Sequence, residues 1–318
     1  LTGTAWAPGY QGEWITINTL GFRGAEITPD KPAGVLRIAV LGGSAVAGAG
    51  VHDDQSIPAY LEALIEETTG CPVEVINGGT SGFTTTQELI QLQIKILPLE
   101  PDIVIFYDGR NDAYFATSPR WDPVYSPPLI AANELINGER RAGVAAQVWL
   151  WLRGHSTLAS AISQVVFAIR GVGLGGLTEA QIAQLTMHPE VTTGYADNLR
   201  AMAQIAQWRG VQPVFVVQPV IGAGDKPLSE DEEQILVIRR EQGYLDLVLA
   251  IYPDMAQAAL GVGDEMGIPA FDYTHVFDEV EETVYSDDVH LRARGNEIVA
   301  EHLVGDLAPL LADLGCAP

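Results

Sequence analysis

The chain has 318 residues, of which 41 are acidic and 17 are basic, and its formal net charge is −24. A surface this acidic repels phosphate backbones and anionic lipid headgroups, which argues against nucleic acid as a partner. The 47% of apolar residues can build a large core, but no run of about 20 apolar residues is free of charges and turn residues, so no membrane-spanning helix is expected.

The first 34 residues match neither a strand nor a helix pattern. They contain several glycines and prolines, Trp6, Trp14 and the phrase Gly21-Phe22-Arg23-Gly24. Glycine and proline are typical of irregular backbone. We therefore expect residues 1–34 to form an irregular lead-in that packs on a single domain formed by residues 35–318.

From residue 35 onward, short strands alternate with helices. The expected strands are almost continuously apolar and rich in β-branched residues, which is typical of parallel strands covered on both faces. They lie at residues 35–41, 73–76, 102–107, 213–218 and 267–271. Helical patterns cover residues 57–69, 84–96, 195–208 and 294–311. This alternation predicts an α/β fold with helices on both sides of an open sheet.

Residues 113–192 interrupt the alternation between the third and fourth expected strands. The segment starts with a cluster of prolines and continues with helix-like apolar runs at 144–152 and 158–169. We expect a helical insertion, which either forms a lid over a binding cleft or adds core packing or a partner surface. Its candidate cleft-lining residues are Tyr114, Phe115, Trp121, Trp149 and Trp151.

Three motifs follow the ends of the first three expected strands, and a fourth lies near the C-terminus. They are Gly42-Gly43-Ser44, Asn77-Gly78-Gly79-Thr80-Ser81-Gly82, Gly109-Arg110-Asn111-Asp112 and Asp287-Asp288-Val289-His290. Each motif alone also fits an ordinary helix cap, a tight turn or a surface histidine. Because ligands bind at the carboxyl ends of strands in such sheets, the joint placement favours a site.

The residue types in these motifs fit nucleophilic catalysis. A serine hydroxyl becomes nucleophilic when an imidazole takes its proton and a carboxylate orients the imidazole. Ser44, His290 and Asp287 offer that set, and the Asp-x-x-His spacing can place the last two on one turn. Glycine N–H groups after the second strand and the amide of Asn111 could hold an oxyanion.

The four motifs together resemble the SGNH, or GDSL-type, hydrolase superfamily over roughly residues 37–311, interrupted by the insertion. The resemblance implies a three-layer α/β/α sandwich with a mostly parallel, five-stranded, flavodoxin-like sheet. It places Ser44 as the nucleophile, and Ser44, Gly82 and Asn111 as oxyanion donors. It also places Asp287 and His290 as the other two catalytic residues.

Two details of the sequence bear on this resemblance. Gly43 stands where the family usually has Asp, so a carboxylate that braces the loop is missing. The Gly21–Gly24 phrase resembles a segment before the first motif of bacterial relatives, some of them exported or anchored. Because the chain begins at Leu1, we expect an upstream signal peptide or membrane anchor and an extracytoplasmic protein, with a cytoplasmic location left open.

The expected activity is that of a serine esterase acting on short-acyl esters, including O-acetyl groups on carbohydrates. Alternatives are an acyltransferase to a sugar hydroxyl, a lipase or thioesterase for longer chains, and a non-catalytic binding module. A nucleotide-binding protein is disfavoured because no phosphate-binding motif is present. The remaining histidines complete no metal-ligand pattern, so neither a metal nor a cofactor is expected. The oligomeric state and the pairing of Cys71 with Cys316 are left open.

Overall fold

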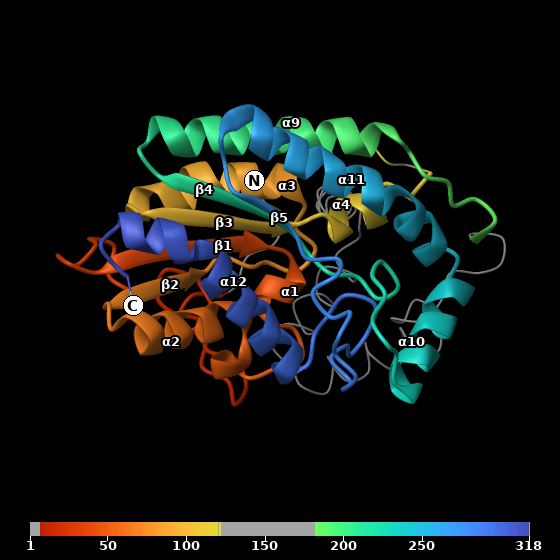
Figure 1. Ribbon diagram of the computed structural model, residues 1–318, viewed down its shortest axis with the longest axis horizontal. Coiled ribbons are helices and arrows are strands. Elements are labelled where there is room, and N and C mark those ends of the chain that lie inside the picture. The colour runs from red at the N-terminus through yellow and green to blue at the C-terminus, as the bar shows by residue number, and fades with distance from the viewer. Residues whose placement is uncertain (1–6, 120, 122–181, 318) are drawn as a thin grey trace, which may run out of the picture.

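A five-stranded sheet forms the middle of the protein in the computed structural model, which describes residues 7–119, 121 and 182–317 (Figure 1). The strand order is β2-β1-β3-β4-β5, and every pairing is parallel. The strands are β1 (Leu36–Gly42), β2 (Val73–Asn77), β3 (Ile103–Asp108), β4 (Gln212–Val217) and β5 (Ala270–Asp272). This is the flavodoxin-like order, whose switch point lies between β1 and β3. The predicted fold class is confirmed, and the sheet is wholly parallel.

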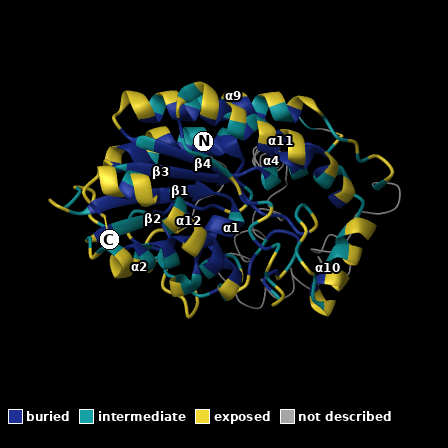
Figure 2. Cartoon of the chain, viewed as in Figure 1, coloured by how far each residue is buried: buried dark blue, intermediate teal, exposed yellow. Residues whose placement is uncertain are grey.

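Helices cover both faces of the sheet. Helices α2 (Ile57–Thr69) and α12 (Ala293–Asp313) contact each other on one face. Helices α3 (Thr85–Gln91), α9 (Glu190–Trp208) and α11 (Leu245–Met266) pack together on the other face (Figure 1). Figure 2 shows the strands buried between helices whose outer faces are exposed. Since β1 and β3 are buried at every residue, their sequences are apolar without alternation, except for Arg37 in β1 and Asp108 at the end of β3.

The helix boundaries follow local capping signals. Helix α2 has the predicted bounds because Ser56 accepts the N–H of Ala59 at its start and Gly70 is left-handed at its end. The helix predicted at 84–96 is less regular. After α3 the chain forms a π-helical turn (Leu92–Ile96) and a 3₁₀ turn (Leu97–Leu99). Helix α9 begins five residues before the predicted start.

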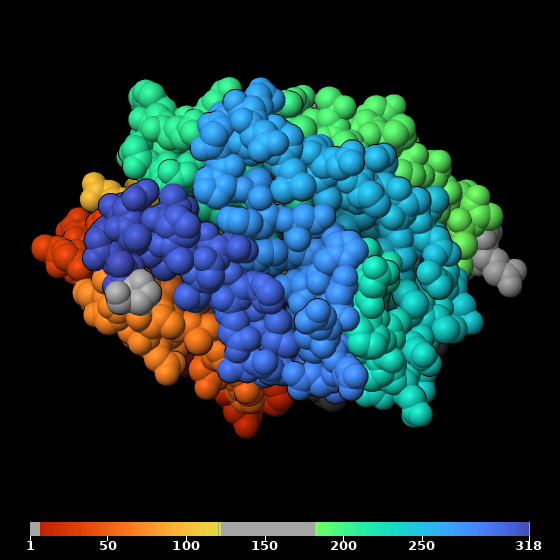
Figure 3. Space-filling model, in the orientation of Figure 1, coloured from red at the N-terminus to blue at the C-terminus, as the bar shows by residue number. Residues whose placement is uncertain are grey.

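Among the described elements, two long helices were not predicted, and neither were the short helices that begin at Ser44 and Arg110. Helix α10 (Glu230–Glu241) starts with a capping box formed by Ser229 and Glu232. Among the described helices, α11 alone is long and apolar enough to cross a membrane. It contacts α9, β4 and β5, however, and its buried residues include Tyr252 and Met255, so it packs as a core helix. In the space-filling view, the C-terminal part (blue) lies between the orange N-terminal part and α10 (Figure 3).

Two connections tie distant parts of the chain together. A disulfide joins Cys71, just before β2, to Cys316 near the C-terminus. The two ends of the predicted insertion also meet, because the N–H groups of Thr186 and His188 donate to the carbonyls of Thr117 and Ala116. The insertion's apolar runs at 144–152 and 158–169, with Trp149 and Trp151, lie outside the described residues.

Candidate active site

The side chains of Ser44, His290 and Asp287 form a continuous chain of hydrogen bonds. Nε2 of His290 lies 2.6 Å from Oγ of Ser44, and Nδ1 of His290 lies 2.7 Å from Oδ2 of Asp287. Oδ1 of Asp287 accepts the backbone N–H groups of Val289 (3.0 Å) and His290 (2.8 Å). Asp287 therefore holds both the backbone of the turn and the ring of the histidine. The structure brings together the three residues that the sequence motifs single out.

The position of Ser44 excludes its alternative interpretation as a helix cap. Ser44 is the first residue of α1 (Ser44–Ala47), which follows β1 directly, and the N-cap position belongs to Gly43. The hydroxyl makes its hydrogen bond to His290 rather than to the helix backbone. As the first helical residue, Ser44 also has a backbone N–H without a partner inside the helix.

Arg23 of the lead-in supports the loop of residues 42–51, which we call the nucleophile loop after the predicted role of Ser44. Its side chain is 1% exposed, and its two Nη atoms donate to the carbonyls of Ala47 and Val51, each at 2.7 Å. Nε of Arg23 pairs with Asp53 at 2.6 Å. Carbonyls at a helix end lack intrahelical donors, so Arg23 caps α1. The Gly-Phe-Arg-Gly phrase singles out Arg23 in the sequence, but it does not predict that this side chain binds the carbonyls at the end of α1.

The second and third motifs, which follow β2 and β3, both lie next to the nucleophile loop. The N–H of Thr80 donates to the carbonyl of Gly42 (3.0 Å), which fixes the loop after β2. Nδ2 of Asn111, in α4 (Arg110–Phe115), donates to the carbonyl of Phe83 at 2.7 Å. An amide nitrogen carries two hydrogens, so the second N–H of Asn111 stays available to a ligand. Gly82 has a φ of +75°, a backbone shape that favours glycine.

The backbone of Gly43 lies in close contact with the side chain of Asn111. A Cβ atom added at Gly43 would overlap Nδ2 of Asn111. Because this amide is the end of a side chain, a larger residue at position 43 would require Asn111 to shift. The first motif thus packs directly on the third.

The charge state of Asp287 suits a residue that orients an imidazole. Burial favours a higher pKa for this carboxyl, but the hydrogen bond and charge of His290, together with the two backbone N–H groups, outweigh it and lower the pKa. Asp287 is therefore ionised at neutral pH. An ionised carboxylate accepts Nδ1–H and leaves Nε2 free to take a proton.

A second group of carboxyls lies buried beneath the third motif. It consists of Glu88 in α3, Asp108 at the end of β3, and Asp112 in α4. Burial raises the pKa of Glu88 well above its usual value, that of Asp108 to about 8 and that of Asp112 to about 6. Asp112 accepts the hydroxyl of Thr85 at 2.6 Å. Both side-chain oxygens of Glu88 and Oδ2 of Asp108 are buried without a hydrogen-bond donor among the described residues, so we infer a proton shared between the two carboxyls.

The predicted substrate-binding aromatics are only partly buried. Tyr114 packs on the guanidinium of Arg110 (4.3 Å) and edge-on against Tyr244 (4.9 Å). Phe115 contacts Tyr114, and Trp121 stacks on His188 at 5.3 Å. No described contact joins these rings to Ser44, so their role in binding remains a prediction.

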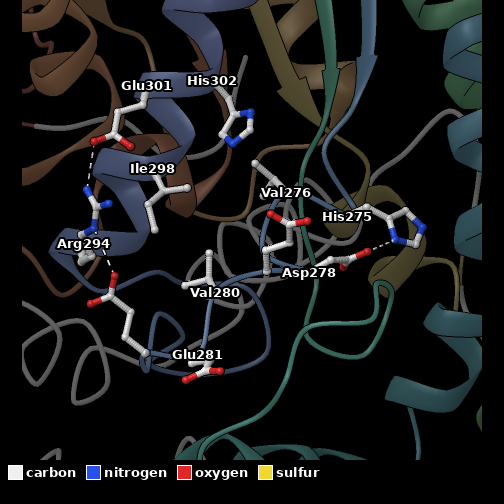
Figure 4. A pocket seen from close by; sticks show the side chains of 11 residues that line it. His275, Val276, Asp278, Val280, Glu281, Arg294, Ile298, Glu301 and His302 are labelled. Carbon is white, nitrogen blue, oxygen red and sulfur yellow. Dashed lines mark hydrogen bonds and ion pairs between the residues drawn. The ribbon is translucent and has the colours of Figure 1, made fainter.

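An open hollow of about 780 Å³ lies beside α12 (Figure 4). Its lining includes His275, Asp278, Glu301 and Arg294, but none of the motif residues. Nδ1 of His275 is 2.7 Å from Asp278, and with Asp225 these side chains bring three potential metal ligands together. The hydrogen bond between the histidine and the aspartate accounts for their proximity without an ion. The ester chemistry is therefore not placed in this hollow.

Comparison with known proteins gives a family match. Residues 40–298 match the model of the GDSL-like lipase/acylhydrolase family. No curated protein matches the chain. Similar solved structures include an acetylxylan esterase from Geobacillus stearothermophilus (14% identity, 86% of this chain and 94% of that chain, TM-score 0.45). Others are the acetyl xylan esterase AlAXEase (14%, 85% and 98%, 0.46) and TesA (16%, 86% and 99%, 0.48). These likenesses are too distant to bear on the substrate.

Proposed function

The chain belongs to the GDSL-like lipase/acylhydrolase family, and from that premise we propose that it is a serine esterase for short-acyl carboxylic esters, O-acetylated carbohydrates among them. The observation that carries the proposal is the hydrogen-bonded chain from Ser44 through His290 to Asp287. A hydroxyl, an imidazole and an ionised carboxylate in this order form a nucleophile, its base and the group that orients the base.

In the proposed reaction, Nε2 of His290 takes the proton of Ser44 while Oγ bonds to the ester carbonyl carbon. Asp287 holds Nδ1–H and stabilises the imidazolium. The intermediate then collapses, the bond to the alcohol oxygen breaks, and His290 returns the proton to that oxygen. A water activated by the same imidazole attacks the acyl-enzyme, releases the carboxylic acid and restores Ser44.

The negative charge on the carbonyl oxygen needs donors placed in advance. We assign this role to the backbone N–H groups of Ser44 and Gly82 and to the side chain of Asn111. The hydrogen bond from Asn111 to Phe83 and the packing of Asn111 on Gly43 support the assignment, because they hold one donor beside the nucleophile loop.

Charge and disulfide chemistry support the choice of substrate and location. A net charge of −24 disfavours anionic esters such as nucleotide thioesters or phospholipids, but does not repel a neutral acetylated sugar. The bond between Cys71 and Cys316 fits an oxidising, extracytoplasmic compartment. Tyr114, Phe115 and Trp121 are the proposed substrate contacts.

Replacing the nucleophile tests the proposal. We expect Ser44→Ala to lower kcat on a chromogenic acetyl ester by about a million-fold and to abolish labelling by a fluorophosphonate probe. Thr68→Ala removes an exposed hydroxyl in α2, outside the four motifs, and serves as the control. Retained turnover or labelling in Ser44→Ala would remove the proposal.

The same preparation tests the substrate class. A panel of esters from acetyl to long acyl, including acetylated sugars, should show the highest kcat/KM for acetyl groups. Preference for long chains would favour a lipase or thioesterase instead. Transfer of the acyl group to an added sugar alcohol, in preference to water, would identify an acyltransferase.

A further inference from the structure

Asp288, the second residue of the Asp287–His290 motif, is buried between two arginines from different helices. It is 2% exposed. Arg110, at the start of α4, donates to Oδ2 of Asp288 through Nε (3.1 Å) and Nη2 (2.6 Å). Arg239 of α10 lies on the other side, with Nε 3.2 Å from Oδ1. A buried carboxylate requires such partners, so Asp288 joins both helices to the turn.

Arg239 also touches the carboxylate that orients the histidine. Its Nη2 lies 3.5 Å from Oδ2 of Asp287, the same oxygen that faces Nδ1 of His290. Nη1 of Arg239 donates to Oε1 of Gln242 at 3.1 Å, and this hydrogen bond fixes the orientation of the guanidinium. One cation thus contacts both Asp287 and Asp288.

Arg110 connects Asp288 to the third motif. Its guanidinium packs over the ring of Tyr114 at 4.3 Å and lies 5.6 Å from the centre of the Tyr244 ring. It directly precedes Asn111 in α4. The turn with Asp287 and His290 is therefore linked through Asp288 to the helix that holds the proposed oxyanion donor.

We propose that Arg239 is a positioning residue that holds Asp287 and sets how readily His290 takes a proton, with Asp288 as its balancing charge; this rests on the proposed function. A cation beside Asp287 offsets part of the negative charge that would stabilise the imidazolium. Without Arg239 the imidazolium is more stable. Without the Asp288 charge the two arginines are less compensated and the imidazolium is less stable.

The other charged groups near the turn are paired among themselves. Glu232 of α10 accepts the N–H groups of Val284 and Tyr285 just before the turn, and it forms an ion pair with Lys226 at 2.9 Å. Arg292, just after the turn, pairs with Asp231 at the surface. Tyr244 faces Asp288 and both arginines, but burial raises its pKa, so it stays neutral. Among the described residues, Arg239, Arg110 and Asp288 are therefore the charges, besides Asp287 itself, whose removal should change the proton affinity of His290.

The pH dependence of kcat/KM on a soluble acetyl ester tests this inference. Its acidic limb reports protonation of the base in the free enzyme. Arg239→Gln should move that limb to higher pH and Asp288→Asn to lower pH, each by roughly half a unit, since the charges are partly screened. Arg239→Lys keeps the charge and should stay near the wild-type profile.

Arg240→Gln is the matched control, because Arg240 follows Arg239 in α10 but pairs with Asp246 at the surface. Its profile should be unchanged. Shifts of the same sign in Arg239→Gln and Asp288→Asn, or no shift in a folded Arg239→Gln, would overturn the inference. Should Asp288→Asn fail to fold, as judged by circular dichroism, Arg239→Gln compared with Arg239→Lys and Arg240→Gln decides. An inactive wild type or an active Ser44→Ala would instead contradict the proposed function.

Discussion

Two groups of carboxyls in this protein lie close to the candidate site but have different partners. Asp287 and Asp288 in the turn meet an imidazole, two arginines and backbone N–H groups. Glu88 and Asp108 beneath the third motif meet mainly each other. Asp288 and Asp108 are equally buried, at 2% and 3% exposure. Burial alone therefore does not decide the role of a carboxyl here; its partners do.

This difference gives the two groups opposite effects on stability as pH changes. The pKa of Asp287 is lowered in the folded protein, so its stabilising contribution is present above about pH 4, the unfolded value, and is lost on acidification. Burial raises the pKa of Asp108 to about 8, so the folded protein binds the extra proton between about pH 4 and about 8. Stability from the buried group is therefore lost as pH rises through that window.

Among the carboxyls and the neighbouring Asn111, the largest expected effect comes from removing the charge of Asp287. Asp287→Asn should lower kcat by roughly 10⁴-fold, because an amide cannot hold the required tautomer of His290 or stabilise its cation. Thermal unfolding at neutral pH should change far less. Asp306→Asn, an aspartate in α12 that accepts the hydroxyl of Tyr273, is a control that leaves the site untouched. If Asp287→Asn turned over substrate at a rate near wild type, the charge of Asp287 would not serve His290, and the two groups of carboxyls would not differ in role.

Replacing Asn111 tests whether the third motif, besides its carboxyls, supplies a hydrogen-bond donor to the oxyanion. Asp108 precedes it at the end of β3 and Asp112 follows it, yet only its amide reaches the nucleophile loop. Asn111→Ala should lower kcat by about 10²- to 10³-fold, the usual loss for one oxyanion donor, with KM nearly unchanged. Steady-state kinetics on the acetyl ester measures both. A rise in KM alone would show that Asn111 binds substrate rather than the transition state.

Sequence patterns predicted the sheet well because its strands are buried on both faces. Near-continuous apolar segments such as β3 have few alternative structures. Helix α10 was missed because its sequence is mostly charged and shows no clear apolar face. Helix α11 was missed because Pro253 and two glycines interrupt its apolar pattern, although proximity to the sheet stabilises it.

The candidate site likewise contains residues that sequence patterns predicted and residues that they did not predict. Ser44, Asn111, Asp287 and His290 stand in short motifs whose spacing is local, so sequence alone could name them. Arg239 has no motif and reaches Asp287 from a helix 48 positions earlier, which only the fold reveals. Glu88 also gives no signal in the sequence, because an acidic residue in a helix is ordinarily exposed.

The smallest effect, and the sharpest test of the buried group, concerns Glu88. In Glu88→Gln the amide can donate to Asp108 without a shared proton, so the loss of stability on raising pH should be smaller. The variant should unfold about 1–2 °C above wild type at pH 8.5, the shift that about 1 kcal/mol gives in a chain of this size, with esterase activity at neutral pH retained. Glu67→Gln, at an exposed position of α2, is the matched control and should follow wild type. An equal decline in melting temperature between pH 5 and 8.5 for wild type and Glu88→Gln would mean that no proton is shared there.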